Sequence, residues 1–472
     1  MSLGTRRCAR PRRTILQVAH DQQHWQERLS SLAEKHGVVG ATLAIGHGTE
    51  DLVAATGVLN VRTQLPATPD SVFQIGSITK TWTATLVMQL VDDGLLDLDL
   101  PVVTYLPDFR VADPAVTAAV TARQLLAHTS GIDGDLFVDT GRGDDAVEKY
   151  VAAMADLAQI HPLGATMSYC NSGYMVLGRL VEVLRGQSWD QVLRERLFAP
   201  LELEAAGTLP EEALLWGAAT GHLRVPSQPE PVVTPLWGIF RGGGPAGLIH
   251  SRAIDVIAFA RLHLADGLAP NGTRILSESA ARAMRTAQVA VPDRWTLGSG
   301  WGLGWILMAW DGKTVYGHDG ATYGQAAFLR VLPAGDDRPA LAVALAVNGG
   351  GARELFQDLF GEVFAELGGV AMPQPLHPSA DKPDDLQRYV GRYARESVDM
   401  VVELDDGGLA LVTRSTGPLG SGEPSRYRLV PCEPDVFLLQ PDGDADGMPA
   451  VFFQVDDHQY LHLGARATPR VS

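Results

Sequence analysis

Apolar and polar residues alternate in short runs at both ends of the first 370 positions, whereas the positions between them follow a helical spacing. Alternation is typical of half-buried strands, and a spacing of three to four residues is typical of helices packed on one face. Strands at both ends with helices between them predict one mixed sheet packed by helices, an α+β fold. The strands are expected at 38–46, 52–58, 305–310, 314–316, 326–332 and 340–347, and the helices near 25–36, 77–93, 121–127, 145–159, 172–185, 189–198, 251–265 and 353–367.

One of these predicted helices, over 77–93, is apolar almost all the way round. A helix without a broad polar face belongs in the interior of a domain. Gly94 ends the pattern, as glycine commonly does at the C-terminus of a helix. We therefore place this helix at the centre of the larger domain.

Composition divides the chain into four parts. Residues 371–384 carry four prolines and predict a linker. Beyond them, 385–472 consists of short alternating runs separated by turns, which fits a small barrel or sandwich; we predict a lipocalin-like barrel. The basic and polar segment 1–24 predicts a disordered N-terminal tail, which leaves 25–370 as the large domain.

The overall composition narrows the class of protein. The chain has 472 residues, 46% of them hydrophobic, and a net charge of −17. Such an acidic balance argues against nucleic-acid and membrane partners, because both require clustered positive charge. Three scattered cysteines (Cys8, Cys170 and Cys432) provide neither a disulfide framework nor a zinc site. The basic N-terminus lacks the apolar run of an export signal, so we expect a cytoplasmic protein.

The strongest candidate chemistry lies at the start of the apolar helix, where Ser77 precedes Lys80 by three residues. This spacing places both side chains on one helix face. A partly desolvated lysine loses its proton near neutral pH and can then act as the base for the serine hydroxyl. Taken alone, the same spacing fits an N-cap serine followed by a solvated lysine equally well.

Two further motifs are weak in isolation. Tyr169 and Asn171 form a Tyr-x-Asn triplet, in which the phenol can share a proton with a lysine and the amide can hold a carbonyl. The alternative is a loop tyrosine with its ring in the core. His318 precedes Gly320 just after a predicted strand, where glycine allows a substrate to approach the backbone. By itself this histidine fits an ordinary surface residue.

Other motifs are set aside. Residues 242–247 match the Gly-x-Gly-x-x-Gly pattern, but Pro245 and the missing strand–turn–helix context argue for a flexible loop near the site instead of a dinucleotide site. His20 and His24 lie in a polar segment without the glutamate of a zinc motif. Cys170 is expected to point away from the site. We therefore predict no metal and no cofactor.

The order of the three motifs resembles that of the serine β-lactamase and penicillin-binding-protein family, in its class C and DD-peptidase/esterase branch. Several other segments are similar to that branch, and the resemblance covers about residues 25–368. These segments are Phe73-Gln-Ile-Gly-Ser-Ile-Thr-Lys, Leu125-Leu-Ala-His-Thr-Ser-Gly131, Tyr169-Cys-Asn-Ser-Gly-Tyr174, Gly244-Pro-Ala-Gly-Leu248 and Gly302-Leu-Gly-Trp305.

The resemblance implies a role for each motif residue. Ser77 would be the nucleophile and Lys80 its base, while Tyr169 would relay protons to the leaving group and from the incoming amine. Asn171 would position the acyl amide. His318 stands where β-lactamases usually have lysine, which argues against a β-lactamase. The backbone amides of Ser77 and Ala321 would form the oxyanion hole.

The layout, with a small β domain after the linker, is similar to penicillin-binding-protein-type thioesterases. This implies an acyl-enzyme formed from a peptidyl thioester with a C-terminal D-residue, free or on a carrier protein, and its release by head-to-tail cyclisation of a nonribosomal peptide. We expect the β domain to help exclude water, and we expect Arg466 to reach the substrate. A cytoplasmic serine esterase or D-amino-acid-specific peptidase is the alternative, and a β-lactamase or an inactive scaffold is disfavoured.

Overall fold

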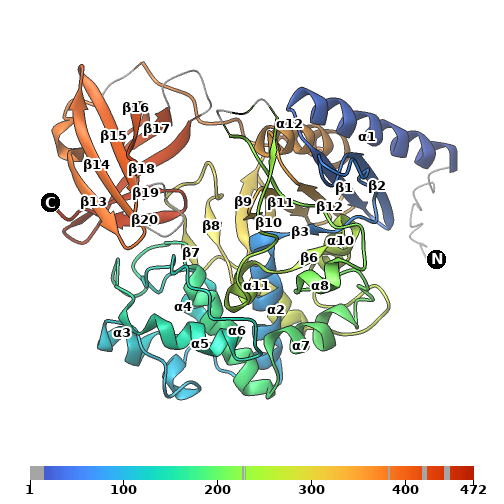
Figure 1. Ribbon diagram of the computed structural model, residues 1–472, viewed down its shortest axis with the longest axis horizontal. Helices are drawn as coiled ribbons and strands as arrows, with labels where there is room; N and C mark the ends of the chain where they lie inside the picture. The colour runs from blue at the N-terminus through green and yellow to red at the C-terminus, as the bar shows by residue number, and fades with distance from the viewer. Residues whose placement is uncertain (1–14, 226–227, 229, 381–382, 417–422, 441–446) are drawn as a thin grey trace, which may run out of the picture.

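The computed structural model describes residues 15–472 except 226–227, 229, 381–382, 417–422 and 441–446 (Figure 1). A large α+β part holds the described residues up to about 370, and a small all-β part, orange to red in Figure 1, packs beside it. This is the predicted β-lactamase/DD-peptidase-like α+β architecture with an additional β barrel. Residues 1–14 of the predicted tail lie outside the described part of the chain.

The large part is organised around an eight-stranded antiparallel sheet. A strand from the start of the domain pairs in this sheet with a strand from its end, because Leu43 lies opposite Leu345. In order across the sheet the strands are β2 (Glu50–Gly57), β1 (Gly40–His47), β12 (Leu341–Val347), β11 (Gln325–Leu332), β10 (Lys313–Thr322), β9 (Ile306–Trp310), β8 (Gly300–Trp301) and β7 (Val289–Ala290).

Helices cover both faces of this sheet. The large aliphatic residues of β12 pack with α1 and α12, whereas its alanines face α10 and the helical layer. The helices are α1 (Ile15–Lys35), α2 (Thr79–Asp92), α3 (Pro114–Ala119), α4 (Ala122–Leu126), α5 (Ala146–Ala153), α6 (Asn171–Arg185), α7 (Trp189–Leu193), α8 (Pro210–Ala213), α9 (Gly244–Gly247), α10 (Ala253–Leu264), α11 (Glu278–Met284) and α12 (Ala352–Val363). Four two-residue strands, β3 (Phe73–Gln74) with β6 (His250–Ser251) and β4 (His222–Leu223) with β5 (Val232–Val233), complete this part.

The predicted tail boundary at residue 24 is wrong, because α1 already begins at Ile15. The polarity of this segment has a structural purpose. Gln26 donates to the carbonyl of Ala55 at 2.8 Å and accepts from its amide at 3.2 Å. Gln22 makes the same pair of bonds with Val53, one turn earlier on the helix. The two glutamines thus provide hydrogen-bond partners for backbone groups at the unpaired edge of β2. The polar sequence of this segment does not by itself reveal that role.

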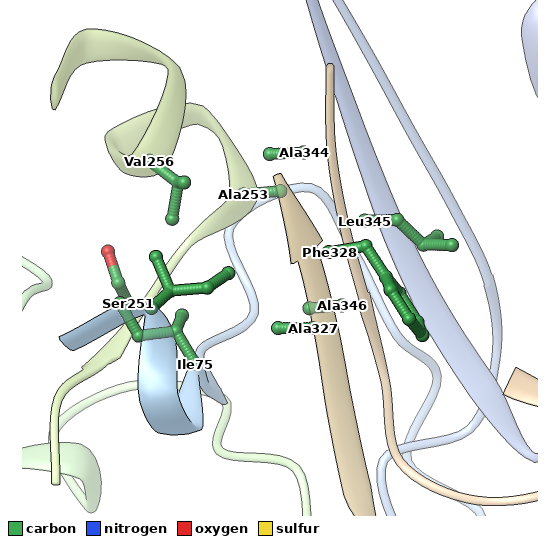
Figure 2. A pocket seen from close by; sticks show the side chains of 10 residues that line it. Ile75, Ser251, Ala253, Val256, Ala327, Phe328, Ala344, Leu345 and Ala346 are labelled. Atoms are coloured by element: carbon green, nitrogen blue, oxygen red, sulfur yellow. The ribbon is translucent and has the colours of Figure 1, made fainter. Parts of the chain in front are cut away.

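Figure 2 shows a small apolar cavity between α10 and the sheet. The side chains of Ala253, Ala327, Ala344 and Ala346 leave this space. Ile75 and Ile78 also line it, and these two residues flank Ser77 in the chain. The cavity therefore lies next to the turn that carries the candidate nucleophile.

The C-terminal part is an eight-stranded antiparallel meander that nearly closes into a barrel. Hydrogen bonds between Arg392 and the last residues, Val471 and Ser472, join its first strand to the end of the chain. The strands are β13 (Gly391–Arg395), β14 (Val398–Asp405), β15 (Gly408–Ser415), β16 (Ser425–Glu433), β17 (Val436–Gln440), β18 (Met448–Val455), β19 (His458–Leu463) and β20 (Arg466–Pro469).

Aromatic and aliphatic side chains fill the interior of the barrel, including Tyr389, Tyr393, Phe437 and Phe452. The barrel thus has a packed core of its own. Within the described ranges, no helix combines the length and the apolar character needed to cross a membrane.

Candidate active site

Ser77 lies in a short 3₁₀ turn, Gly76–Ile78, that leads directly into α2. Gly76 has a φ of +51°, and a Cβ atom at this position would lie 2.5 Å from the amide nitrogen of Ala321 on β10. A side chain at residue 76 would therefore be strained and would collide with the neighbouring strand. Glycine lets the turn press against β10, which brings Ser77 to the sheet edge.

Lys80 is fully buried one turn below Ser77. Its Nζ lies 3.0 Å from Ser77 Oγ and donates to the carbonyl of Ala246 at 2.7 Å. Burial, reinforced by the positive charge of Arg466, lowers the pKa of Lys80 well below its usual value. The N-cap alternative is wrong, since Lys80 is not solvated and no side chain caps α2.

Tyr169 lies immediately before α6, with its ring against the same amine. The distance from Lys80 Nζ to the ring centroid is 4.9 Å. Burial raises the pKa of the Tyr169 phenol, and a hydrogen bond with Ser77 opposes this shift in part. Ser77, Lys80 and Tyr169 therefore form one hydrogen-bonded group in which burial disfavours both the phenolate of Tyr169 and the ammonium of Lys80.

Two aromatic residues that the motif analysis did not select hold the Tyr169 ring. His128 stacks on it at 4.3 Å between centroids, and Trp301 contacts its edge at 5.7 Å. His128 Nδ1 accepts the backbone N–H of Cys170 at 3.0 Å, which fixes the imidazole. Burial lowers the pKa of His128 well below its usual value. His128 belongs to the Leu125–Gly131 segment, so sequence similarity marked the region but not this contact.

His318 lies inside β10, which runs on through Thr322 instead of ending at Tyr316 as expected. Its side chain is buried, so the surface alternative is wrong. Nδ1 lies 2.6 Å from the carbonyl of Asp319 and must donate to it, which leaves Nε2 as the acceptor. Burial and then Lys80 lower the pKa of His318 to about 3, so the ring is neutral. Among the described residues, Nε2 has no hydrogen-bond partner.

The two predicted oxyanion-hole amides lie on adjoining segments. A Cβ at Gly320 would lie 2.9 Å from the nitrogen of Ser77, just as one at Gly76 would lie 2.5 Å from that of Ala321. The glycines on either side thus allow the two backbones to touch. Such closeness is what a pair of converging N–H donors requires.

Arg466 comes from the barrel, at the start of β20, and lies across Tyr169. Its guanidinium carbon is 5.1 Å from the Tyr169 ring centroid. The sequence did not single out Asp135, whose carboxylate accepts two hydrogen bonds from this guanidinium. Nε of Arg466 donates to Oδ2 at 3.1 Å, and Nη2 donates to Oδ1 at 2.7 Å. Asn171 donates to the same carboxylate at 3.4 Å. The structure therefore joins both predicted substrate-binding side chains, Asn171 and Arg466, through one aspartate.

The remaining candidates have structural roles. Cys170 caps α6, since its Sγ accepts the N–H of Gly173, and burial raises the pKa of its thiol to about 12. Residues 242–247 were expected to form a flexible loop; this expectation is wrong, because all six are buried, the first two in a 3₁₀ turn and the last four in α9. Pro245 and Ala246 supply carbonyls to Thr83 and Lys80.

Comparison with known proteins agrees with this geometry. A family model described as Beta-lactamase matches residues 24–364, and the chain belongs to this family. Penicillin-binding protein 4 of Amycolatopsis lactamdurans is 49% identical over 380 residues, which are 80% of this chain and 98% of that protein. Unguisins hydrolase ungD' of Aspergillus campestris is 26% identical over 326 residues, 66% of this chain and 59% of that protein.

Among solved structures, the crystal structure of SurE covers 96% of this chain and 100% of its own, with a TM-score of 0.76 and 31% identity. A second SurE structure, with D-Leu, has a TM-score of 0.74 and 30% identity over the same shares. The likeness therefore extends over the barrel as well as the large domain. The predicted fold and family are confirmed, and the protein is an enzyme of the serine hydrolase and acyltransferase class.

Proposed function

We propose that this enzyme takes the acyl group of a peptidyl thioester with a C-terminal D-residue onto Ser77 and releases it by head-to-tail cyclisation of a nonribosomal peptide. The observation that carries the proposal is the position of Arg466: the barrel contributes a side chain that lies 5.1 Å from the Tyr169 ring, beside Ser77 and Lys80. The barrel is thus part of the site.

In the first half-reaction, Ser77 Oγ attacks the thioester carbon and passes its proton to the neutral Lys80 amine. The amine is suited to this role because burial disfavours its charged form. The amides of Ser77 and Ala321 stabilise the oxyanion. The C–S bond then breaks, and the thiolate leaves and takes up a proton through Tyr169 from Lys80.

In the second half-reaction, the α-amine of the same peptide attacks the ester carbon. The amine proton passes through Tyr169 to Lys80, and Ser77 Oγ regains a proton as the ester bond breaks. The neutral His318 offers only the lone pair of Nε2, so it can accept a hydrogen bond from an incoming N–H. Holding the amine close to the ester favours it over water.

Two comparisons support the choice of substrate. SurE, which matches the chain over nearly its whole length, has a structure with D-Leu. Penicillin-binding protein 4, the relative at 49% identity, is named for binding penicillin. The acyl donor of the proposal is a peptidyl thioester, either free or attached to a carrier protein. Both kinds have the same reacting carbon. A hydrolase is the second candidate, favoured by the relative named unguisins hydrolase.

The nucleophile is tested with a fluorescent penicillin as the acylating probe. We expect covalent labelling of the wild-type protein and none of Ser77→Ala. A matched control is Ser172→Ala, because Ser172 is buried at the start of α6 and binds Tyr150 instead of Lys80. Equal labelling of wild type and Ser77→Ala would refute the assignment.

Cyclisation and hydrolysis are separated by mass. A peptide thioester with D-Leu at its C-terminus and a free N-terminal amine is incubated with the enzyme. We expect a product lighter than the linear acid by one water. Linear acid as the sole product, over several peptide sequences and lengths, would favour the hydrolase. Acetylating the N-terminal amine provides the control, since it removes the nucleophile but leaves the thioester intact.

A further inference from the structure

Four charged residues connect the barrel to the large domain beside the active site, and we call them the clasp: Asp133, Asp135, Arg395 and Arg466. The two aspartates lie in the loop between α4 and α5, whereas the arginines come from β13 and β20. Arg395 Nη1 lies 2.6 Å from Asp135 Oδ2 and 3.7 Å from Asp133 Oδ1. Asp135 therefore accepts from both arginines of the barrel.

The clasp is shielded from solvent. The side chains of Asp133 and Asp135 are 1% and 5% exposed, and those of Arg395 and Arg466 are 11% and 21% exposed. Burial alone would favour a neutral carboxyl, but the charges of Arg466 and Arg395 lower the pKa of Asp135 to about 2. Asp135 is thus ionised whenever the two domains are docked as seen here.

The backbone couples the clasp to Tyr169. The amide of Tyr169 donates to the carbonyl of Ala465 at 2.9 Å, and the amide of Ala467 donates to Ser168 Oγ at 3.1 Å. The residues on either side of Arg466 are therefore hydrogen-bonded to the segment that carries Tyr169. The guanidinium of Arg466 lies over the Tyr169 ring as well.

We propose that Asp135 is a positioning residue, which fixes the guanidinium of Arg466 against Tyr169 and so makes docking of the barrel a condition for rapid acylation. This rests on the proposed function only in taking Ser77 and Tyr169 as the reacting groups. Without the carboxylate, Arg466 has no bidentate partner and is free to leave the ring. Asp135 touches no reacting atom and acts through Arg466.

The matched control is an aspartate that binds an arginine elsewhere in the same barrel. Asp399 on β14 pairs with Arg392 on β13 at 2.8 Å, and both side chains are far more exposed, at 33% and 51%. Asp399→Asn removes one carboxylate charge, as Asp135→Asn does, but from an exposed ion pair with another arginine, Arg392. Asp135→Glu retains the charge and serves as the conservative variant.

The experiment measures kcat and KM for the acetylated D-Leu peptide thioester, with each rate divided by the number of Ser77 side chains that fluorescent penicillin titrates. We expect Asp135→Asn to lower kcat about 10- to 100-fold, Asp135→Glu to recover part of it, and Asp399→Asn to stay within about twofold of wild type. Titrating the reactive serine distinguishes a variant that is partly misfolded from one that is folded but reacts slowly.

A double-mutant cycle then tests the route of the effect. If Asp135 acts through Arg466, Asp135→Asn/Arg466→Gln is no slower than Arg466→Gln alone. Additive losses, or a titrated Asp135→Asn enzyme with wild-type kcat, would overturn the proposal. The amine-blocked substrate cannot cyclise, so these outcomes are independent of whether the wild type makes rings or linear acid.

Discussion

The neutral state of Lys80 makes a prediction about stability as well as about catalysis. Lys80→Met replaces the amine by an apolar chain of similar length at a fully buried position. In the wild type, burial lowers the pKa of Lys80 in the folded state well below the usual 10.5. At pH values between the folded and the unfolded pKa, the unfolded state therefore binds a proton that the folded state does not. The unfolded state thus binds more protons, so raising the pH stabilises the folded protein.

The magnitude follows from linkage. Between the folded pKa of Lys80 and its unfolded value, the wild-type free energy of unfolding should rise by about 1.4 kcal/mol per pH unit relative to Lys80→Met. Over two pH units inside that window this amounts to about 2.7 kcal/mol. Groups shared by both proteins cancel in the difference.

Urea unfolding followed by tryptophan fluorescence measures this difference in the correct domain. All nine tryptophans precede residue 311, so the signal reports the large domain and not the barrel. Parallel stability curves for wild type and Lys80→Met over pH 7–9 would show that the folded protein keeps Lys80 protonated, which would refute its role as the base. We also expect Lys80→Met to lose about 10²- to 10⁴-fold in acylation rate, the usual contribution of a general base.

Three further changes follow from the structure. Gly76→Ala should cost at least about 1–2 kcal/mol, because an L-residue is strained at a φ of +51° and its Cβ meets the amide of Ala321, and penicillin labelling should fall with it; normal labelling would contradict the proposed close packing. Gln26→Ala should cost about 1–2 kcal/mol of unfolding free energy, since two hydrogen bonds to Ala55 are lost, whereas the exposed Gln23→Ala should cost much less. His318 has a pKa of about 3 in the folded protein, so it contributes a loss of stability as the pH falls below 6.5; His318→Asn should show a shallower loss between pH 6 and pH 4, and an unchanged slope would mean that the folded ring is already charged.

Much of the fold could be predicted because its elements are local and strongly patterned. The helix after Ser77 and the buried strand over 341–347 were expected almost to the residue, since the helix has apolar residues on nearly every side and the strand is apolar over its whole length. The start of α1 was not, because Gln22 and Gln26 pair with a strand edge that is distant in sequence. Polar residues that satisfy backbone groups look like surface residues when only the sequence is known.

The site shows the same division. Ser77 and Lys80 share a helix turn, so their contact follows from spacing alone. Asp135 has no such local pattern, and its importance arises only because two barrel arginines reach it. Arg466 was expected to reach the substrate from near the end of the last strand, but it begins a further strand, β20, which four residues of weak alternation did not reveal.

The origin of Arg466 in β20 also has a consequence for the order in which the enzyme becomes active during its synthesis. Domains generally fold as units, starting from the N-terminal one. The large domain, with its nucleophile and base, is complete in the chain before the barrel strands emerge from the ribosome. A nascent chain at that stage has the serine but not the arginine from β20. If Asp135 and Arg466 act as proposed, β20 therefore sets the time at which the enzyme becomes active, because acylation stays slow until the barrel has folded and docked.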